Sequence, residues 1–212
     1  MPTINEYMQE YVNWMQSYLD RGFEVTFLSL MFNPLPESQH VKKVMMEEAI
    51  YDCYRKAVKA MFRRPRSVGI QDLPFWVTSY DRPVWKGDHK MKRDHLANIA
   101  INDGLHLHAM CLTPPNTRLG MPFELHLHDH QSRYAPKDGP INRIHASTVA
   151  EENVKKTARY ALKSIERRRI GVGDAIILPK SHSEFSRLGK NETPRDAAQR
   201  RMFDFCAETD AN

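Results

Sequence analysis

Residues 104–114 read GLHLHAMCLTP, an apolar run that contains two histidines one residue apart. Side chains of a β-strand alternate between two faces, so His106 and His108 are expected to project from the same face. The opposite face is apolar and consists of Leu105, Leu107, Ala109 and Cys111. The stretch therefore predicts a strand that packs one face on a core and holds two imidazoles side by side on the other.

Helical and extended patterns alternate along the rest of the chain. Apolar residues at helical intervals predict helices over residues 4–21, 38–62 and 148–169, and a last helix is expected over 193–206. Two of these helices begin with the spacing of a capping box, Thr3 with Glu6 and Thr148 with Glu151. Runs of β-forming residues predict strands over residues 23–33, 73–85 and 174–179.

Two connections complete this outline. Asn102, Asp103 and Gly104 have the chemistry of a tight turn, which predicts a hairpin between residues 96–101 and the strand that carries the histidines. Residues 114–146 contain several prolines and no sustained period, so we expect a loop there with at most one short strand. The order of elements predicts an α+β fold in which helices flank a central antiparallel sheet.

Length and composition limit the class of protein. With 212 residues, 41% of them hydrophobic and 27% charged, the chain is long enough for one complete core. We expect a single domain over residues 1–212, with an N-terminal helix within 1–21 and a helical extension over 180–212. No apolar run approaches the length of a bilayer span and no secretory signal is visible, so a cytoplasmic location is expected.

The cysteine content limits the possible metal ligands, and the charge content indicates the kind of partner. Cys53, Cys111 and Cys206 are widely spaced and odd in number, which fits reduced thiols better than a disulfide framework or a paired-cysteine zinc site. A bound metal ion would therefore need histidine and carboxylate ligands. The formal net charge of +5 and the pI near 9.1 suit a polyanionic partner.

The predicted helix over residues 148–169 concentrates this positive charge. Seven of the fifteen residues in 155–169 are Lys or Arg, and they are Lys155, Lys156, Arg159, Lys163, Arg167, Arg168 and Arg169. Such a face attracts the phosphates of a nucleic acid. Tyr160 and Lys163 are three residues apart, so they are expected to be neighbours on the exposed side of the helix. A tyrosine beside a cation can act as a nucleophile toward phosphate.

Three motifs occur in an order that is similar to a known superfamily. The apolar strand FLSLMF, then His106-Leu107-His108, then Tyr160-Ala161-Leu162-Lys163 resembles the motifs of the HUH endonucleases, especially the single-tyrosine initiators of rolling-circle replication. The resemblance implies an antiparallel sheet flanked by helices, with the first motif on a central strand and the histidines on its neighbour. It also implies cleavage of single-stranded or hairpin DNA that leaves a 5′-phosphotyrosine and a free 3′-OH.

The resemblance assigns a role to each matching residue. His106 and His108 would hold a divalent ion, Mg or Mn, with Asp81 at the end of PFWVTSYD as the third ligand. Tyr160 would be the nucleophile and Lys163 its helper. No helicase motifs accompany these residues, so a replicative role would need a host helicase.

Other interpretations of the same residues remain open. The histidine pair can be ordinary polar surface, and the basic helix can be only a solvated face. A second cluster in FELHLHDH would place Glu124, His126, His128 and His130 on one face if it were extended, as in a metal hydrolase. The protein can also be a nucleic-acid-binding protein without chemistry, or a transposase or mobilisation nickase of the same superfamily.

Overall fold

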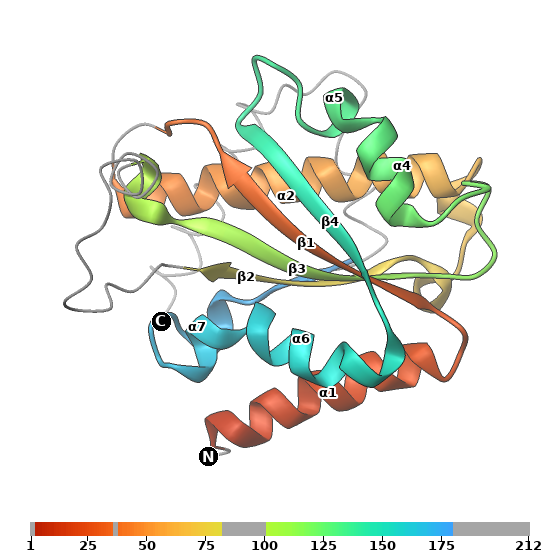
Figure 1. The fold of residues 1–212 in the computed structure, drawn as a ribbon, viewed down its shortest axis with the longest axis horizontal. Helices are drawn as coiled ribbons and strands as arrows, with labels where there is room; N and C mark the ends of the chain where they lie inside the picture. Colours follow the sequence, from red (N-terminus) through yellow and green to blue (C-terminus); the bar gives the residue numbers. More distant parts are fainter. Residues whose placement is uncertain (1–2, 36–37, 82–100, 180–212) are drawn as a thin grey trace, which may run out of the picture.

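The computed structural model describes residues 3–35, 38–81 and 101–179, and these residues form an α+β structure around one five-stranded sheet (Figure 1). The strands are β1 (Glu24–Phe32), β2 (Phe75–Asp81), β3 (His106–Thr113), β4 (Ile141–Val149) and β5 (Ile176–Leu178). Their order across the sheet is β4-β1-β3-β2-β5, and each neighbouring pair is antiparallel. The predicted α+β fold with an antiparallel sheet is confirmed.

Helices cover both faces of the sheet (Figure 1). One face carries α2 (Gln39–Met61), with α4 (Phe123–Asp129) and α5 (Gln131–Tyr134) beside β4. The opposite face carries α1 (Ile4–Leu19), α6 (Val154–Ala161) and α7 (Lys163–Glu166). Within the described ranges, no helix combines the length and the apolar composition that a bilayer span requires.

The alternation of β3 divides its side chains between two apolar cores. Leu107, Ala109 and Cys111 are fully buried in the core under α2, as the sequence predicted. Met110 and Leu112 lie on the histidine face and are buried against α1 and α6. His106 and His108 therefore lie on the same face of the sheet, just beyond the end of this second core.

Two long helices follow their local sequence signals. At the start of α1, the Thr3 hydroxyl accepts from the Glu6 backbone and the Glu6 carboxylate accepts from the Thr3 backbone, which completes the predicted capping box. Ser38 caps α2 in the same way by accepting from the backbone of Val41. Both helices lie close to the predicted ranges.

The predicted hairpin before β3 is wrong. Both edges of β3 are already paired, one with β1 and the other with β2. Residues 101–104 form a short 3₁₀ helix in which Asn102 and Asp103 adopt left-handed backbone angles. The side chain of Asn102 accepts from Leu35 N and donates to Asn33 O, so the turn residues tie two loops together instead of closing a hairpin. Residues 96–100 lie outside the described residues.

The region after β3 also differs from the prediction. Residues 114–146 were expected to be mainly loop, but they contain α4, α5 and most of β4. The expected capping box at Thr148 does not form, because Thr148 lies in β4 and its hydroxyl donates to Glu124. The predicted helix over 148–169 is instead two short helices, α6 and α7, separated at Leu162. The helix expected over 193–206 and the extension over 180–212 lie outside the described residues.

Candidate metal centre

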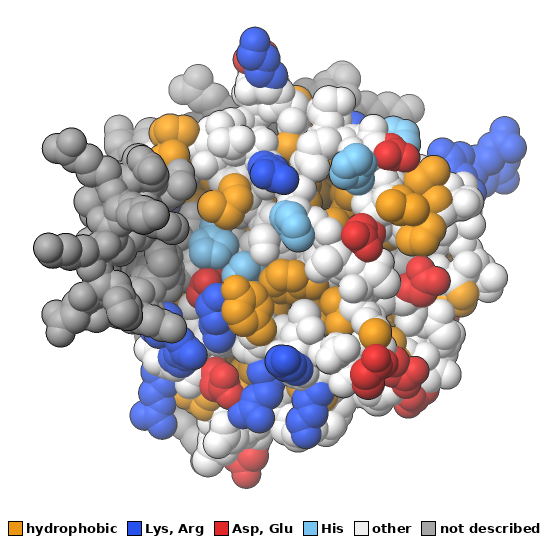
Figure 2. Space-filling view, viewed as in Figure 1, with side chains coloured by type: hydrophobic (Ala, Val, Ile, Leu, Met, Phe, Trp, Pro, Cys, Tyr) orange, Lys and Arg blue, Asp and Glu red, His pale blue; other side chains and the backbone are white. Residues whose placement is uncertain are grey.

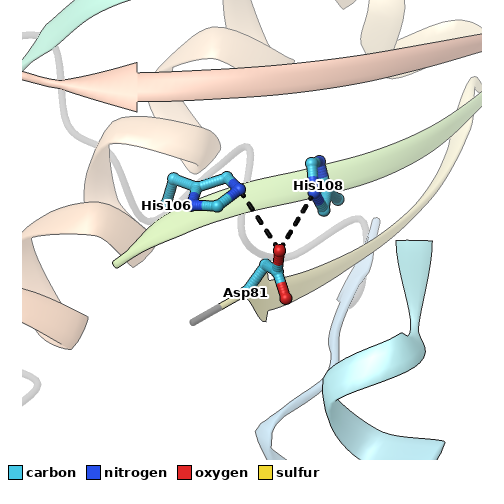
Figure 3. Close-up of side chains that lie close together, drawn as sticks. All are labelled: Asp81, His106 and His108. Atoms are coloured by element: carbon cyan, nitrogen blue, oxygen red, sulfur yellow. Dashed lines mark ion pairs between the residues drawn. The ribbon is translucent and has the colours of Figure 1, made fainter. Parts of the chain in front are cut away.

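Two neighbouring strands bring three possible metal ligands together (Figure 3). Asp81 is the last residue of β2 and pairs directly with His106, the first residue of β3. His108 follows two residues later on the same face, so its imidazole lies beside that of His106. The ring centroids of the two histidines are 4.8 Å apart. The antiparallel register therefore joins residues that are 25 positions apart in the sequence.

The three side chains converge on one oxygen atom. Asp81 Oδ2 lies 3.3 Å from His106 Nε2 and 3.4 Å from His108 Nε2. One ligand atom from each residue can be chosen so that all three lie within 4.8 Å of one another, a spacing that could hold a metal ion. Asp81 and His108 are buried, and the side chain of His106 is 18% exposed. The site is enclosed by protein but accessible at His106.

A hydrogen bond to the backbone orients His106. Its Nδ1 lies 2.9 Å from the carbonyl oxygen of Gly104, which can only accept, so Nδ1 carries the proton and donates it. In the neutral ring, Nε2 then holds a lone pair directed at Asp81 Oδ2. Two acceptors at this distance repel each other unless a cation lies between them or the ring takes a second proton. The arrangement therefore suits a metal ion.

His108 has the corresponding arrangement on the neighbouring strand. Its Nδ1 lies 3.0 Å from Ser29 Oγ on β1, while its buried Nε2 has no hydrogen-bond partner. Burial lowers the pKa of His108, which favours the neutral ring. A neutral imidazole with a free nitrogen is the form that binds metals. Asp81, His106 and His108 could thus hold a metal ion.

Asp81 has two further partners on the helical side of the site. Lys163 Nζ lies 2.7 Å from Asp81 Oδ2, and the buried Ser164 hydroxyl donates to Oδ1 over 2.7 Å. Burial by itself raises the pKa of Asp81, but the close polar side chains of His106, His108, Lys163 and Ser164 outweigh it and hold this pKa well below its usual range. Asp81 is therefore a carboxylate with a fixed orientation.

Tyr160 lies next to this group on α6. Its ring centroid is 5.3 Å from that of His108 and 5.8 Å from that of Phe27 on β1. Lys163 Nζ lies 4.0 Å from the centroid of the Tyr160 ring, a cation–π contact, and Tyr160 is 51% exposed. The predicted neighbours Tyr160 and Lys163 are thus in contact, and both lie at the histidine pair.

The other basic residues are only partly on one helix. Lys155, Lys156 and Arg159 lie on α6 and are exposed, whereas residues 167–169 come after the end of α7. Arg159 donates to Glu166 at 2.6 Å, so this charge is partly neutralised. Figure 2 shows Lys and Arg side chains gathered over the region of α1, α6 and α7, beside histidine and exposed hydrophobic side chains.

The second histidine cluster does not form a site. Residues 123–129 are helical rather than extended, so the side chains do not share the face expected for a strand. His126 is buried with its Nε2 3.0 Å from the Tyr134 hydroxyl, and the His128 side chain is 84% exposed beside Asp129. Glu124 instead accepts from the backbone and hydroxyl of Thr148. Glu124 thus ties α4 to β4, and His126 ties α4 to α5.

The chain was compared with protein-family models, with curated proteins and with solved structures, and no match was found. The description of this region as a candidate metal centre on an α+β fold therefore rests on the geometry of Asp81, His106 and His108 alone. Two residues of the site, Ser29 and Ser164, were not predicted from the sequence. Ser29 lies in the motif FLSLMF and Ser164 directly follows Lys163, and only the packing of β1 and α7 against β2 and β3 shows their contacts.

Proposed function

We propose that this protein is a metal-dependent nickase of single-stranded DNA that attaches the cut strand to Tyr160. The observation that carries the proposal is the position of Tyr160, whose ring contacts both His108 of the candidate metal centre and the ammonium of Lys163. A nucleophile, a cation and a set of metal ligands thus lie within one small region. This combination suits attack on a phosphodiester.

The chemistry follows from the groups in place. The phenol oxygen of Tyr160 forms a bond to phosphorus and gives up its proton, the bond from phosphorus to the 3′ oxygen breaks, and that oxygen leaves as a hydroxyl. The products are a 5′-phosphotyrosine and a free 3′-OH. Lys163 supplies positive charge beside the phenol and the phosphate. A divalent ion held by Asp81, His106 and His108 would polarise the scissile phosphate.

The ligand set also indicates the class of ion. Two imidazoles with one carboxylate suit a first-row transition ion such as Mn²⁺, whereas Mg²⁺ prefers oxygen ligands and retains several waters. Both ions can support phosphoryl transfer, and the three ligands leave further positions for a phosphate oxygen and water. We therefore expect Mn²⁺ to bind more tightly than Mg²⁺ at this site.

The open part of the sheet face supports a single-stranded substrate. Cross-strand pairing places Met31 opposite Arg143 and Ser29 opposite His145, on the same face as His108. Met31, Arg143 and His145 are exposed, because α1 and α6 cover only the far end of this face. Flat, exposed sheet surfaces with aromatic and cationic side chains bind unpaired bases and their backbone. A stacked duplex could not bring its phosphate to Tyr160 without local unpairing.

The same surface favours a second candidate, a nucleic-acid-binding protein without chemistry. This function would use the open face of β1 and β4 and the basic residues of α6, and it would not need Tyr160 beside a metal centre. The two candidates differ in one observable: only the nickase forms a covalent bond to DNA.

The test is a covalent-adduct assay. The protein is incubated with labelled single-stranded oligonucleotides or hairpins and Mn²⁺, and the products are separated on a denaturing gel. We expect an adduct with the wild-type protein, none with Tyr160→Phe, and an unchanged adduct with Tyr7→Phe, which alters an exposed tyrosine on α1 away from the site. Adduct formation by Tyr160→Phe would exclude Tyr160 as the nucleophile.

A further inference from the structure

Lys163 and the candidate metal ligands share one atom of Asp81. Lys163 Nζ is 2.7 Å from Oδ2, the same oxygen that both histidine Nε2 atoms approach at 3.3 and 3.4 Å. The other oxygen, Oδ1, is already used by the hydroxyl of Ser164. A divalent ion placed among the three ligand atoms would therefore contact the oxygen to which the ammonium is bound.

Two cations close to one buried oxygen repel each other. The side chain of Asp81 is 3% exposed and that of Lys163 19%, so water screens their charges only weakly. The lysine ammonium is a mobile charge on a long flexible side chain. The three ligand side chains are held in place by hydrogen bonds, Asp81 by Ser164, His106 by the Gly104 carbonyl and His108 by Ser29. When the two cations compete, the lysine is the group that can move.

The structure also contains a second partner for the ammonium. Lys163 Nζ already lies 4.0 Å from the centroid of the Tyr160 ring, and that ring is half exposed at the entrance of the site. Lys163 is the first residue of α7, directly after the break at Leu162, so its side chain lies at a helix junction rather than within a continuous helix. A small rotation would keep the cation–π contact while Oδ2 is released.

From these contacts we propose that Lys163 is an exchangeable counter-ion: it neutralises Asp81 in the structure described here, and a divalent ion displaces it toward Tyr160. The inference rests on the proposed function, since it concerns the same metal centre. It links the two parts of the site, because the cation that assists Tyr160 becomes free of Asp81 only when the ion has bound.

The exchange predicts that Lys163 competes with the ion. We expect Lys163→Met to bind Mn²⁺ about tenfold more tightly than the wild-type protein in calorimetric titrations, a typical size for coupling between two binding events. Lys163→Gln keeps a hydrogen-bond donor near Asp81 without the charge, and it should show the same direction. Lys59→Met removes the same charge from the exposed end of α2 and should leave the Mn²⁺ affinity unchanged.

A second measurement observes the lysine directly in the wild-type protein and uses a variant only to assign its resonance. In protein with ¹³C-labelled lysine, the Lys163 side-chain resonance is the one absent from the Lys163→Gln spectrum. We expect it to shift during titration with Mg²⁺ and to saturate with the binding curve. A resonance that stays in place while Mg²⁺ saturates the site would overturn the exchange, as would equal or weaker Mn²⁺ binding by both Lys163 variants.

These results separate the exchange from the proposed function. If neither the wild-type protein nor the Lys163 variants bind Mn²⁺, the metal centre is wrong and both proposals fail. If Mn²⁺ binds and Lys163 behaves as described but no covalent DNA adduct forms, the exchange stands and the nickase is rejected.

Discussion

Ser29 and His108 lie directly opposite each other on β1 and β3, and Ser29 Oγ is 3.0 Å from His108 Nδ1. This contact fixes the plane of the imidazole and leaves Nε2 directed at Asp81. Hydrogen bonds of this kind orient metal-binding histidines in many proteins, and losing one weakens metal binding. Ser29 is therefore a positioning residue for the candidate metal centre.

The first prediction concerns this contact. Ser29→Ala should weaken Mn²⁺ binding about tenfold, because the ring of His108 loses the partner that orients it. Ser147→Ala, which changes another serine of the same sheet face at a β4 position paired with Phe27, should have no effect on Mn²⁺ affinity. Calorimetric titration of the three proteins checks this. Equal affinities would mean that His108 does not depend on Ser29.

The second prediction compares the two histidine clusters. His106→Ala and His108→Ala should each abolish measurable Mn²⁺ binding at micromolar protein concentration, since each removes one of three ligands. His128→Ala should bind Mn²⁺ like the wild-type protein, because this side chain is exposed on α4 and belongs to no ligand group among the described residues. The opposite pattern in the same titration would place the ion at α4.

The third prediction is a pH dependence of stability. Burial lowers the pKa of both His108 and His126, so the unfolded chain binds protons that the folded protein resists. The free energy of unfolding should therefore fall as the pH decreases below about 6.5, the ordinary pKa of histidine, with a slope of up to about 1.4 kcal/mol per pH unit for each proton taken up. Urea unfolding of the metal-free protein between pH 5 and 8 measures this slope.

The control for this dependence is a comparison of histidine variants. His108→Gln should reduce the slope and leave the part that comes from His126. His40→Gln alters an exposed histidine near the start of α2 and should keep the slope of the wild-type protein. If the slope is unchanged in His108→Gln, the imidazole of His108 in the wild-type protein titrates as it does in the unfolded chain.

The fourth prediction concerns binding of the DNA backbone. Arg167→Glu with Arg168→Glu reverses two exposed charges after α7 and should weaken binding of all single strands alike. The plot of log affinity against log salt should also become less steep by about 0.7 for each lost phosphate contact. Fluorescence anisotropy across a salt series, at fixed Mn²⁺, measures both effects. An unchanged slope would assign these arginines to a solvated surface.

Several features of the site could be predicted because they depend on neighbours in the sequence. The alternation in residues 105–111 was enough to place His106 and His108 on one face, since the period of a strand does not depend on its partners. In the same way, the three-residue spacing of Tyr160 and Lys163 predicted their contact. Asp81 was chosen as the third ligand by resemblance, and the register of β2 with β3 brings it to His106.

Other features could be decided only by tertiary contacts. FELHLHDH alternates like a strand but forms a helix, because its apolar residues Phe123 and Leu127 are four positions apart and pack into the core under α2. Thr148 resembles a helix cap but lies in β4 opposite Thr26 of β1, and both its backbone N–H and its hydroxyl donate to Glu124. A local sequence pattern can fit both a helix and a strand, and it does not show which of the two will find tertiary contacts.

The sequence by itself determined that His106 and His108 share one face of β3 and that Tyr160 and Lys163 are neighbours. The tertiary structure decided which of these residues meet. Pairing of β3 between β1 and β2 brings Ser29 and Asp81 to the histidines, and the break at Leu162 lets α7 place Lys163 and Ser164 on Asp81. The physical reason is that periodicity arises within a strand or helix, whereas register and helix breaks are selected by burial across the whole core.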